Sequence, residues 1–285
     1  MAAVVTASNE SLLRGLLRRP PAMVGLAILL AIVTLAIAAN LVAPFSPAKL
    51  SIASRLQAPS LVHLFGTDEF GRDVFSRTLY AGRVSLAIGG AVVAISTLIG
   101  VALGLTAGYF RALDAPLSRV IDAMMAFPDI LLAIALVAAL GPNAINVVLA
   151  LGIVYAPRAA RVVRASTLVI RELAYVEAAR ALGVPTPIIL IRHILRNLAS
   201  PIMVQSTFIF ANAILAEAGL SFLGVGVSPD IPTWGTMIAM GRQFIDQAGW
   251  ILWFPGAAIV ISVMSLQLLG DALRDLLDPR LARTS

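Results

Sequence analysis

Three carboxylates lie inside strongly apolar stretches of this sequence. Asp122 and Asp129 belong to the stretch VIDAMMAFPDILLAI, and Glu217 belongs to ILAEAGLSFLG. A carboxylate is costly inside a bilayer, so such a group faces a partner, a water-filled cavity or a membrane boundary. We predict that Asp122 lies at the membrane interface and that Asp129 and Glu217 line a translocation pathway. For Asp129 and Glu217, a structural hydrogen bond between helices is the alternative.

These carboxylates do not form a recognisable catalytic set. The sequence places no nucleophile, metal-ligand cluster or glycine-rich phosphate loop beside them. It contains no cysteine, which excludes disulfides, thiolate metal sites and iron–sulfur clusters. Its two histidines, His63 and His193, are too far apart in sequence to suggest a metal site. We therefore expect no catalytic residue, no metal site and no cofactor bound by this chain.

The elements that position these groups are predicted to be membrane helices. Of the 285 residues, 59% are hydrophobic and 13% are charged, whereas a soluble domain is about half apolar and a quarter charged. A span needs about 20 apolar residues. We predict an all-α, polytopic protein with six spans, at 22–43, 84–108, 118–140, 143–164, 201–224 and 250–270. We read the first as an uncleaved membrane helix, with a signal peptide as the alternative.

The basic residues predict the orientation of the spans. Six spans with the N-terminus inside assign fifteen of the 21 basic residues to inner segments and six to outer ones. Because positive residues accumulate in cytoplasmic loops, both termini and the segment 165–200 are expected to face the cytoplasm. The net charge of +6 is then explained by topology, and nucleic acid is not an expected partner.

The connector between the first two spans carries the stretch HLFGTDEFGRDVFSRTLYAGRVSL. Thr67 or Asp68 is predicted to cap an interfacial helix that leads into the second span. Its acidic residues are expected to cap that helix and pair with Arg72 and Arg77 rather than to bind a cation.

We predict that the chain has two domains. Residues 1–83 comprise the N-terminal segment, the first span and the external connector. Residues 84–285 form a five-helix core with the cytoplasmic 165–200 loop and a cytoplasmic C-terminal tail.

Two segments have distinctive small or helix-breaking residues. Glycines at every fourth position of the second span, Gly100, Gly104 and Gly108, predict close packing against another helix. Between residues 171 and 198, Gly183 is expected to end one short helix in the left-handed conformation. Pro185 and Pro187 then suit the first turn of a second helix.

This last segment resembles the EAA loop of ABC-importer permeases. The similarity rests on EAARALGVPTPIILIRHIL, and it departs from the family only at its exit, where a proline is delayed to Pro201. In that family the loop forms a coupling helix that docks on a cytoplasmic ATPase subunit. The resemblance implies a role in ATPase coupling for Glu177, Ala178, Ala179, Gly183, Ile191 and His193.

Three further stretches are similar to the DppC/OppC branch, the peptide and nickel importer permeases. They are FGTDEFGRDVFSR (65–77), ILAEAGLSFLGVGVSPDIPTWGTMI (214–238) and LGDALRDLLDPRL (269–281). The resemblance covers nearly the whole chain and implies the type I ABC importer permease fold. It also implies a bacterial plasma membrane location and four kinds of partner: a homologous second permease in a heterodimer, ATPase subunits, an extracytoplasmic substrate-binding protein and the lipid bilayer.

The energy source is expected to lie on the partner subunits. The sequence has no G-x-x-x-x-G-K-[ST] motif, so ATP and Mg²⁺ are expected on the ATPase subunits and not on this chain. The chain is therefore predicted to be a permease and not an enzyme, with peptides as the leading substrate. The alternatives are an importer of nickel complexes and an ion-coupled secondary transporter that uses Asp129 and Glu217.

Overall fold

The computed structural model describes residue 15 and residues 19–277. Within that part every regular element is a helix, and a single isolated β-bridge joins Thr67 to Asp73. The long helices are α2 (Pro20–Ile37), α4 (Val74–Tyr109), α5 (Arg111–Met125), α6 (Asp129–Leu140), α7 (Ala144–Ile170), α10 (Ala199–Phe222) and α13 (Trp250–Leu277). The short ones are α3 (Ala39–Val42), η1 (Ile52–Ser54), α8 (Ala174–Ala181), α9 (Thr186–Ile188), η2 (Ile189–Ile194), η3 (Leu195–Leu198), α11 (Trp234–Gly241), η4 (Arg242–Phe244) and α12 (Ile245–Ala248).

Five helical segments are long and apolar enough to cross a membrane, and a bent pair makes a sixth. The bent pair is α5 and α6, whose axes meet at 91°. A span over 118–140 was predicted, with a kink at Pro128; the structure confirms a break there, and the break divides the segment into two helices. Pro128 lacks an amide donor and disfavours helical geometry at Phe127, so the helix ends at Met125 and restarts at Asp129.

The connector before α4 is irregular, and the predicted interfacial helix starting at Thr67 or Asp68 is absent from it. The helix begins only at Val74, and the Asp73 carboxylate caps it by accepting a hydrogen bond from the Ser76 amide at 2.8 Å. Gly66 and Gly71 adopt φ values of +73° and +69°, which break helical geometry on either side of Asp68. The predicted domain boundary at residue 83 therefore falls inside α4.

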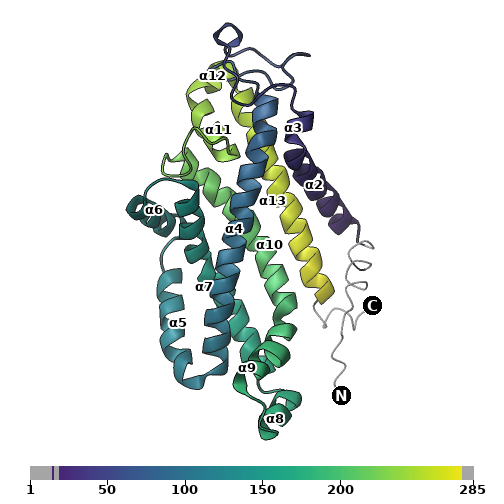
Figure 1. The fold of residues 1–285 in the computed structure, drawn as a ribbon, viewed down its shortest axis with the longest axis vertical. Helices are drawn as coiled ribbons and strands as arrows, with labels where there is room; N and C mark the ends of the chain where they lie inside the picture. The colour runs from purple at the N-terminus through teal and green to yellow at the C-terminus, as the bar shows by residue number, and fades with distance from the viewer. Residues whose placement is uncertain (1–14, 16–18, 278–285) are drawn as a thin grey trace.

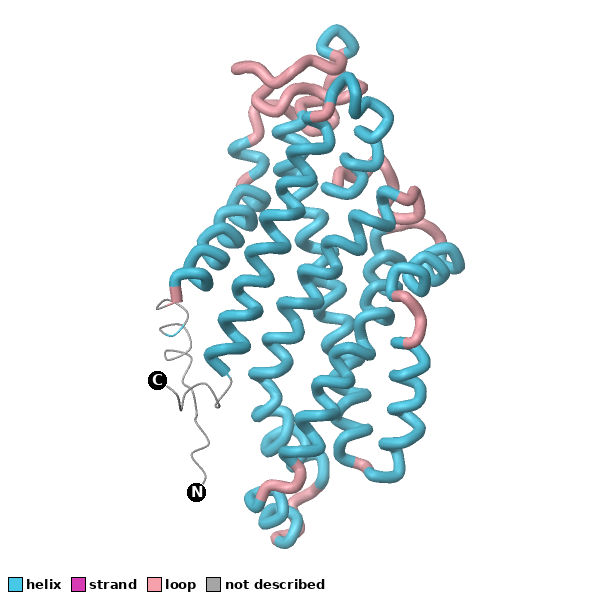
Figure 2. Tube along the Cα trace, turned by 180° about the vertical axis from the view of Figure 1, so that it is seen from behind, coloured by secondary structure: helices cyan, strands magenta, loops and turns pink. Residues whose placement is uncertain are grey.

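The centre of the fold is the pair α4 and α7, which lie side by side along most of their length (Figure 1). The glycine seam allows this approach, as predicted: a Cβ atom on Gly104 would lie 2.6 Å from the Ala160 carbonyl oxygen. Helix α10 packs on α4 and α13, and α13 packs on α2. The helical bundle is elongated, with α8 at one end and the 44–73 connector at the other (Figure 2).

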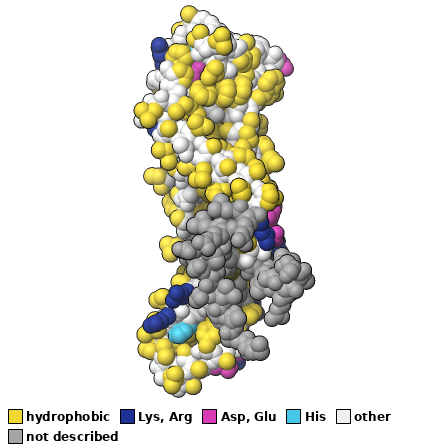
Figure 3. All heavy atoms as spheres, turned by 90° about the vertical axis from the view of Figure 1, so that its right-hand side faces the viewer, with side chains coloured by type: hydrophobic (Ala, Val, Ile, Leu, Met, Phe, Trp, Pro, Cys, Tyr) yellow, Lys and Arg dark blue, Asp and Glu magenta, His cyan; other side chains and the backbone are white. Residues whose placement is uncertain are grey.

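The first span, α2, lies at the edge of the bundle. At its C-terminal end, Arg83 of α4 donates to the carbonyl oxygens of Ala36 and Ile37 at 2.5 and 2.6 Å. At its other end, Arg19 pairs with Asp275 of α13 at 3.0 Å. Figure 3 shows many hydrophobic side chains on this face above the atoms drawn in grey, as expected for helices in contact with lipid.

Candidate functional site

A row of ion pairs joins α7 to the bent pair α5 and α6. Arginines at every third position of α7 lie on one side of that helix and meet aspartates that approach from α5 and α6. The pairs are Asp129 with Arg158, Asp122 with Arg161 at 2.8 Å, and Asp114 with Arg164 at 2.5 Å. We call these three pairs the ion-pair ladder.

The ladder is partly exposed on the surface of this single chain. The Asp122 side chain is 65% exposed and that of Arg161 is 53% exposed. Exposed charges are strongly disfavoured against hydrocarbon, so this face of α5, α6 and α7 fits a water-filled space or a protein partner better than lipid. The predicted pathway residue Asp129 therefore lies in a polar cluster on this face, where it pairs with Arg158. Asp122, predicted at the membrane interface, lies in the same cluster.

Glu217 lies elsewhere, in a buried polar network. Its side chain is 1% exposed and accepts hydrogen bonds from Ser221 at 2.9 Å and from Thr233 at 2.8 Å. Asp129 and Glu217, singled out together from the sequence, therefore do not form one site. In this conformation the contacts of Glu217 are those of a structural link between α10 and α11. Its role in the pathway remains a prediction.

The network holds α11 against the bundle, and the sequence reasoning missed most of its members. Thr233 caps α11 through the amide of Thr236 at 3.0 Å. The buried Trp234 forms two hydrogen bonds with α4. Its amide donates to Ser85 Oγ at 3.1 Å, and its indole donates to the Thr78 carbonyl at 3.0 Å. The signal that could have revealed this link is the sequence PTWG, a capping threonine after a proline and before a large aromatic residue.

The 165–200 segment folds as two short helical pieces around an exposed turn at the end of α7. Helix α8 ends at Ala181, and Gly183 adopts φ +73°, as predicted. The second piece was expected to be regular over 188–198, but it contains a π-helix in η2 and a 3₁₀ turn in η3. Asn197 explains part of this irregularity, because its side-chain amide donates to the His193 carbonyl at 2.7 Å.

The two faces of this segment, which we call the coupling element (residues 174–198), differ sharply. Buried apolar side chains pack it onto α7: Val176, Ala179, Ile189, Ile194 and Leu198 meet Val163. Of the six residues predicted to act in coupling, Glu177, Ala178, Gly183 and Ile191 are exposed, His193 is half-buried and Ala179 is buried. Leu182 at the turn is 83% exposed, and Ile191 is 66% exposed. The element thus presents an apolar tip that the described part of the chain does not cover.

Two protein-family models match the sequence of this chain. The model of binding-protein-dependent transport system inner membrane components matches residues 96–283, and the N-terminal transmembrane domain of oligopeptide transport permease C matches residues 11–59. The first match covers more than half of the chain. The protein therefore belongs to the family of binding-protein-dependent transport system inner membrane components, and within it to the DppC/OppC type of ABC permease.

Relatives of known description cover nearly the whole chain. A provisionally named peptide transport system permease protein of Brucella suis biovar 1 is 50% identical over 94% of this chain and 90% of its own length. The dipeptide transport system permease protein DppC of Alkalihalophilus pseudofirmus is 45% identical over 91% and 86%. The di/tripeptide transport system permease protein DppC of Pseudomonas aeruginosa is 43% identical over 91% and 88%.

The fold agrees with this assignment. A solved structure of the MetNI methionine ABC transporter, in inward-facing conformations, aligns with a TM-score of 0.57. It is 17% identical and covers 71% of this chain and 96% of its own. The family models and the permease relatives together show that the chain is a multi-pass membrane permease subunit of an ABC importer and not a catalytic enzyme. These matches favour that reading over the ion-coupled secondary transporter.

Proposed function

We propose that this chain forms half of the translocation pathway of a peptide importer. The observation that carries the proposal is the similarity, along nearly the whole chain, to permeases described as dipeptide and di/tripeptide transporters. A homologous second permease would supply the other half, facing the ion-pair ladder across a water-filled space. The ladder suits such a space, because its fixed charges can pair with the ammonium and carboxylate groups of a peptide.

The coupling element would dock on a cytoplasmic ATPase subunit that binds ATP and Mg²⁺. Its exposed apolar tip at Leu182 and Ile191 supports this role, since an apolar tip in water gains by entering a groove on a partner. Movement of the ATPase subunits would reach the spans through the buried contacts between the coupling element and Val163 of α7.

The proposed orientation places both termini and the coupling element in the cytoplasm. Six crossings, with α5 and α6 counted as one, put both ends on the same side of the membrane. The ion pair between Arg19 and Asp275 supports this, because it joins the start of the first span to the end of the last. The residues before 15 and after 277, including the predicted cytoplasmic tail, lie outside the described residues.

The direct test is uptake by the reconstituted transport system. Proteoliposomes with both permeases, the ATPase subunits and the binding protein should accumulate a radiolabelled dipeptide only when ATP is present on the ATPase side. A parallel assay with a nickel complex separates the two substrate classes. Uptake of the nickel complex without uptake of peptides would contradict the peptide proposal, and uptake without ATP under an ion gradient would contradict the ABC mechanism.

A further inference from the structure

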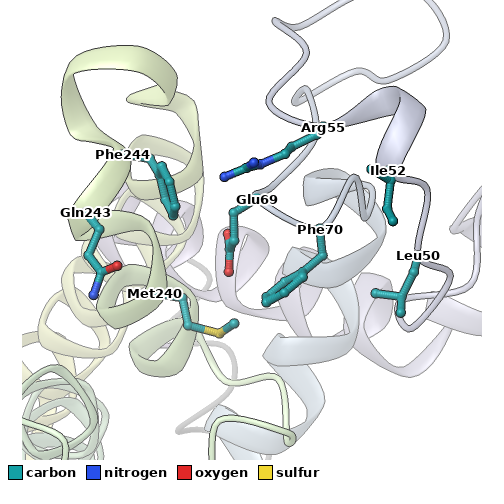
Figure 4. A pocket seen from close by; sticks show the side chains of 8 residues that line it. All are labelled: Leu50, Ile52, Arg55, Glu69, Phe70, Met240, Gln243 and Phe244. Atoms are coloured by element: carbon teal, nitrogen blue, oxygen red, sulfur yellow. The ribbon is translucent and has the colours of Figure 1, made fainter.

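A pocket of about 670 Å³ opens at the end of the chain opposite the coupling element. One wall comes from the 44–73 connector, with Leu50 and Phe70, and the other from α11 and η4, with Met240 and Phe244. Figure 4 shows these walls facing each other across Glu69, whose carboxyl group is directed into the space between them. The pocket is therefore a mostly apolar cleft whose lining includes one acidic side chain, Glu69, and one basic side chain, Arg55.

Glu69 has an unusual environment for a carboxylate. Its side chain is only 9% exposed. Its Oε1 atom lies 3.6 Å from the Arg72 guanidinium, but its Oε2 atom is buried and has no hydrogen-bond partner among the described residues. Burial raises the pKa of this carboxyl, and the neighbouring Asp68 acts in the same direction. An acceptor buried in this way is destabilising until a donor reaches it.

Two nearby arginines, Arg72 and Arg77, are already engaged by other groups. Arg72 donates to Asp68 at 2.6 Å, and Arg77 lies 3.5 Å from the same carboxylate and donates to the Pro47 carbonyl at 3.2 Å. Arg55 also lines the pocket, and its guanidinium lies over the Phe244 ring at 5.9 Å. The Oε2 atom is therefore the acceptor of this cluster that has no hydrogen-bond partner among the described residues.

We propose that this pocket receives a lysine or arginine side chain of the substrate-binding protein. The cation would pair with the Glu69 carboxylate, and its aliphatic stem would pack along Phe70, Met240 and Phe244. A long cationic side chain is the group that satisfies an apolar cleft and a buried carboxylate together. The inference rests on the proposed function, because it assigns a contact to the binding protein on which that function depends.

A docking partner fits the position of the pocket better than a transported peptide does. Its lining residues come from the connector, α11 and η4, whereas the ion-pair ladder lies on α5, α6 and α7. In the proposed orientation the pocket is extracytoplasmic and lies beyond the spans, where the binding protein arrives. A free peptide held there would not yet have reached the polar face that α5, α6 and α7 present.

The test measures the affinity of the purified binding protein, from the same transport system, for the complete transporter in nanodiscs. Glu69→Gln keeps the shape of the side chain and removes the charge, so we expect Kd to rise at least about tenfold, as for loss of a buried charge pair. Asp246→Asn is the matched control: it removes one charge from an exposed position of neighbouring α12, and Kd should change by less than about twofold.

A second variant tests the cleft and not the charge. Gln243 lies exposed at the pocket rim, and Gln243→Trp should block entry while leaving Glu69 in place, with a similar rise in Kd. This variant keeps the proposal testable if Glu69→Gln does not assemble. Lysine and arginine substitutions in the binding protein should then include one whose effect disappears in the Glu69→Gln background.

Three outcomes would overturn parts of the proposal. If the wild-type transporter binds its binding protein and both pocket variants bind it equally well, the docking site is wrong while the importer function stands. If the variants instead weaken binding of a free labelled dipeptide, measured without the binding protein, the pocket is a peptide site. If the wild-type transporter binds no binding protein at all, the proposed function itself fails.

Discussion

At the scale of single residues, the carboxylates of this chain fall into three environments. Asp129 pairs with an arginine on a partly exposed face. Glu217 is buried inside the chain, where its Oε1 atom accepts from two hydroxyl groups and its Oε2 atom has no hydrogen-bond partner among the described residues. Within the described part of the chain, Glu69 also has one buried, unpaired oxygen, but its side chain lines a pocket. A carboxylate therefore forms an ion pair between helices at Asp129, a structural link between α10 and α11 at Glu217, and a proposed docking contact at Glu69. Substitution should affect a different property of the protein at each of these positions.

Glu217→Ala should reduce stability more than it alters substrate choice. The change leaves the hydroxyls of Ser221 and Thr233 without their acceptor, and we expect the free energy of unfolding to fall by about 1–3 kcal/mol. Thermal unfolding of the purified transporter measures this effect. Glu217→Gln, which keeps an acceptor oxygen, is the control and should retain most of the stability. Normal stability with loss of uptake in the alanine variant would assign Glu217 to the pathway instead.

Glu69→Gln should stabilise the free transporter at neutral pH. The folded-state pKa of Glu69 lies above its ordinary value of 4.5, so the folded protein holds this proton more tightly than the unfolded chain. Stability is then lost as pH rises from about the ordinary value through the raised folded pKa. The variant should melt at a higher temperature than the wild type at pH 7, and the difference should vanish at acidic pH. An equal difference at both pH values would contradict this argument.

At the scale of elements, glycines decide which helices can approach and where the chain turns. The seam on α4 needs bare backbone, because a Cβ on Gly104 would meet the backbone of α7. Gly183 has a different role: its surroundings are open, and only its positive φ calls for glycine. Packing and conformation can therefore be tested separately.

Gly104→Ala should destabilise the bundle. The added methyl group would lie 2.6 Å from the Ala160 carbonyl oxygen, and overpacking of this kind costs about 1–3 kcal/mol. Gly90→Ala on the same helix is the matched control, since no atom lies within 4 Å of its Cβ position. That variant should be neutral or slightly stabilised in thermal unfolding. Equal stability of both variants would contradict close packing at the seam.

Gly183→Val should separate ATP hydrolysis from uptake. The left-handed conformation disfavours valine by about 1–2 kcal/mol, so the turn of the coupling element should rearrange while the spans stay folded. Uptake by proteoliposomes should fall several-fold, with ATP hydrolysis retained. Gly224→Val is the control, because Gly224 has φ +81° in equally open surroundings after α10. A similar loss of uptake in both variants would point to general backbone strain.

Several features at this scale could be predicted from the sequence, because residues close together in the chain determine them. Apolar length predicted the spans, glycine spacing predicted the seam, and Gly183 with two prolines predicted the turn. The 91° break at Pro128 was underestimated, because a proline indicates a bend but not its angle. None of the three ion pairs of the ladder was predicted from the sequence. Its pairs link residues 29 to 50 positions apart, and such partners are settled by the packing of helices rather than by local pattern.

At the scale of the whole molecule, the two ends of the bundle differ in construction. One end is the coupling element with its apolar tip. The other end is the irregular connector, which is held by ion pairs of Arg72 and Arg77 with Asp68. If the chain spans the membrane as proposed, these ends face different compartments and meet different partners.

Cysteine labelling tests this orientation with little background, because the sequence has no cysteine. Leu61→Cys places a thiol on the connector, and Leu182→Cys places one on the coupling element; both positions are strongly exposed. In intact cells or spheroplasts, a membrane-impermeant maleimide should label position 61. Position 182 should react only after the membrane is opened and the ATPase subunits are removed. The reverse pattern would invert the proposed topology.

The right angle between α5 and α6 has a consequence for the thickness of the permeability barrier. Neither helix is long enough to cross alone: twelve residues of α6 extend about 18 Å, against a hydrocarbon core of about 30 Å. If the ladder faces the translocation pathway as proposed, α6 lies across that pathway and contributes one helix diameter, about 10 Å, instead of a full span. In that arrangement, water that reached the ladder from the side of α8 would already have passed much of the bilayer, and a small tilt of α6 would change the opening through the remaining layer.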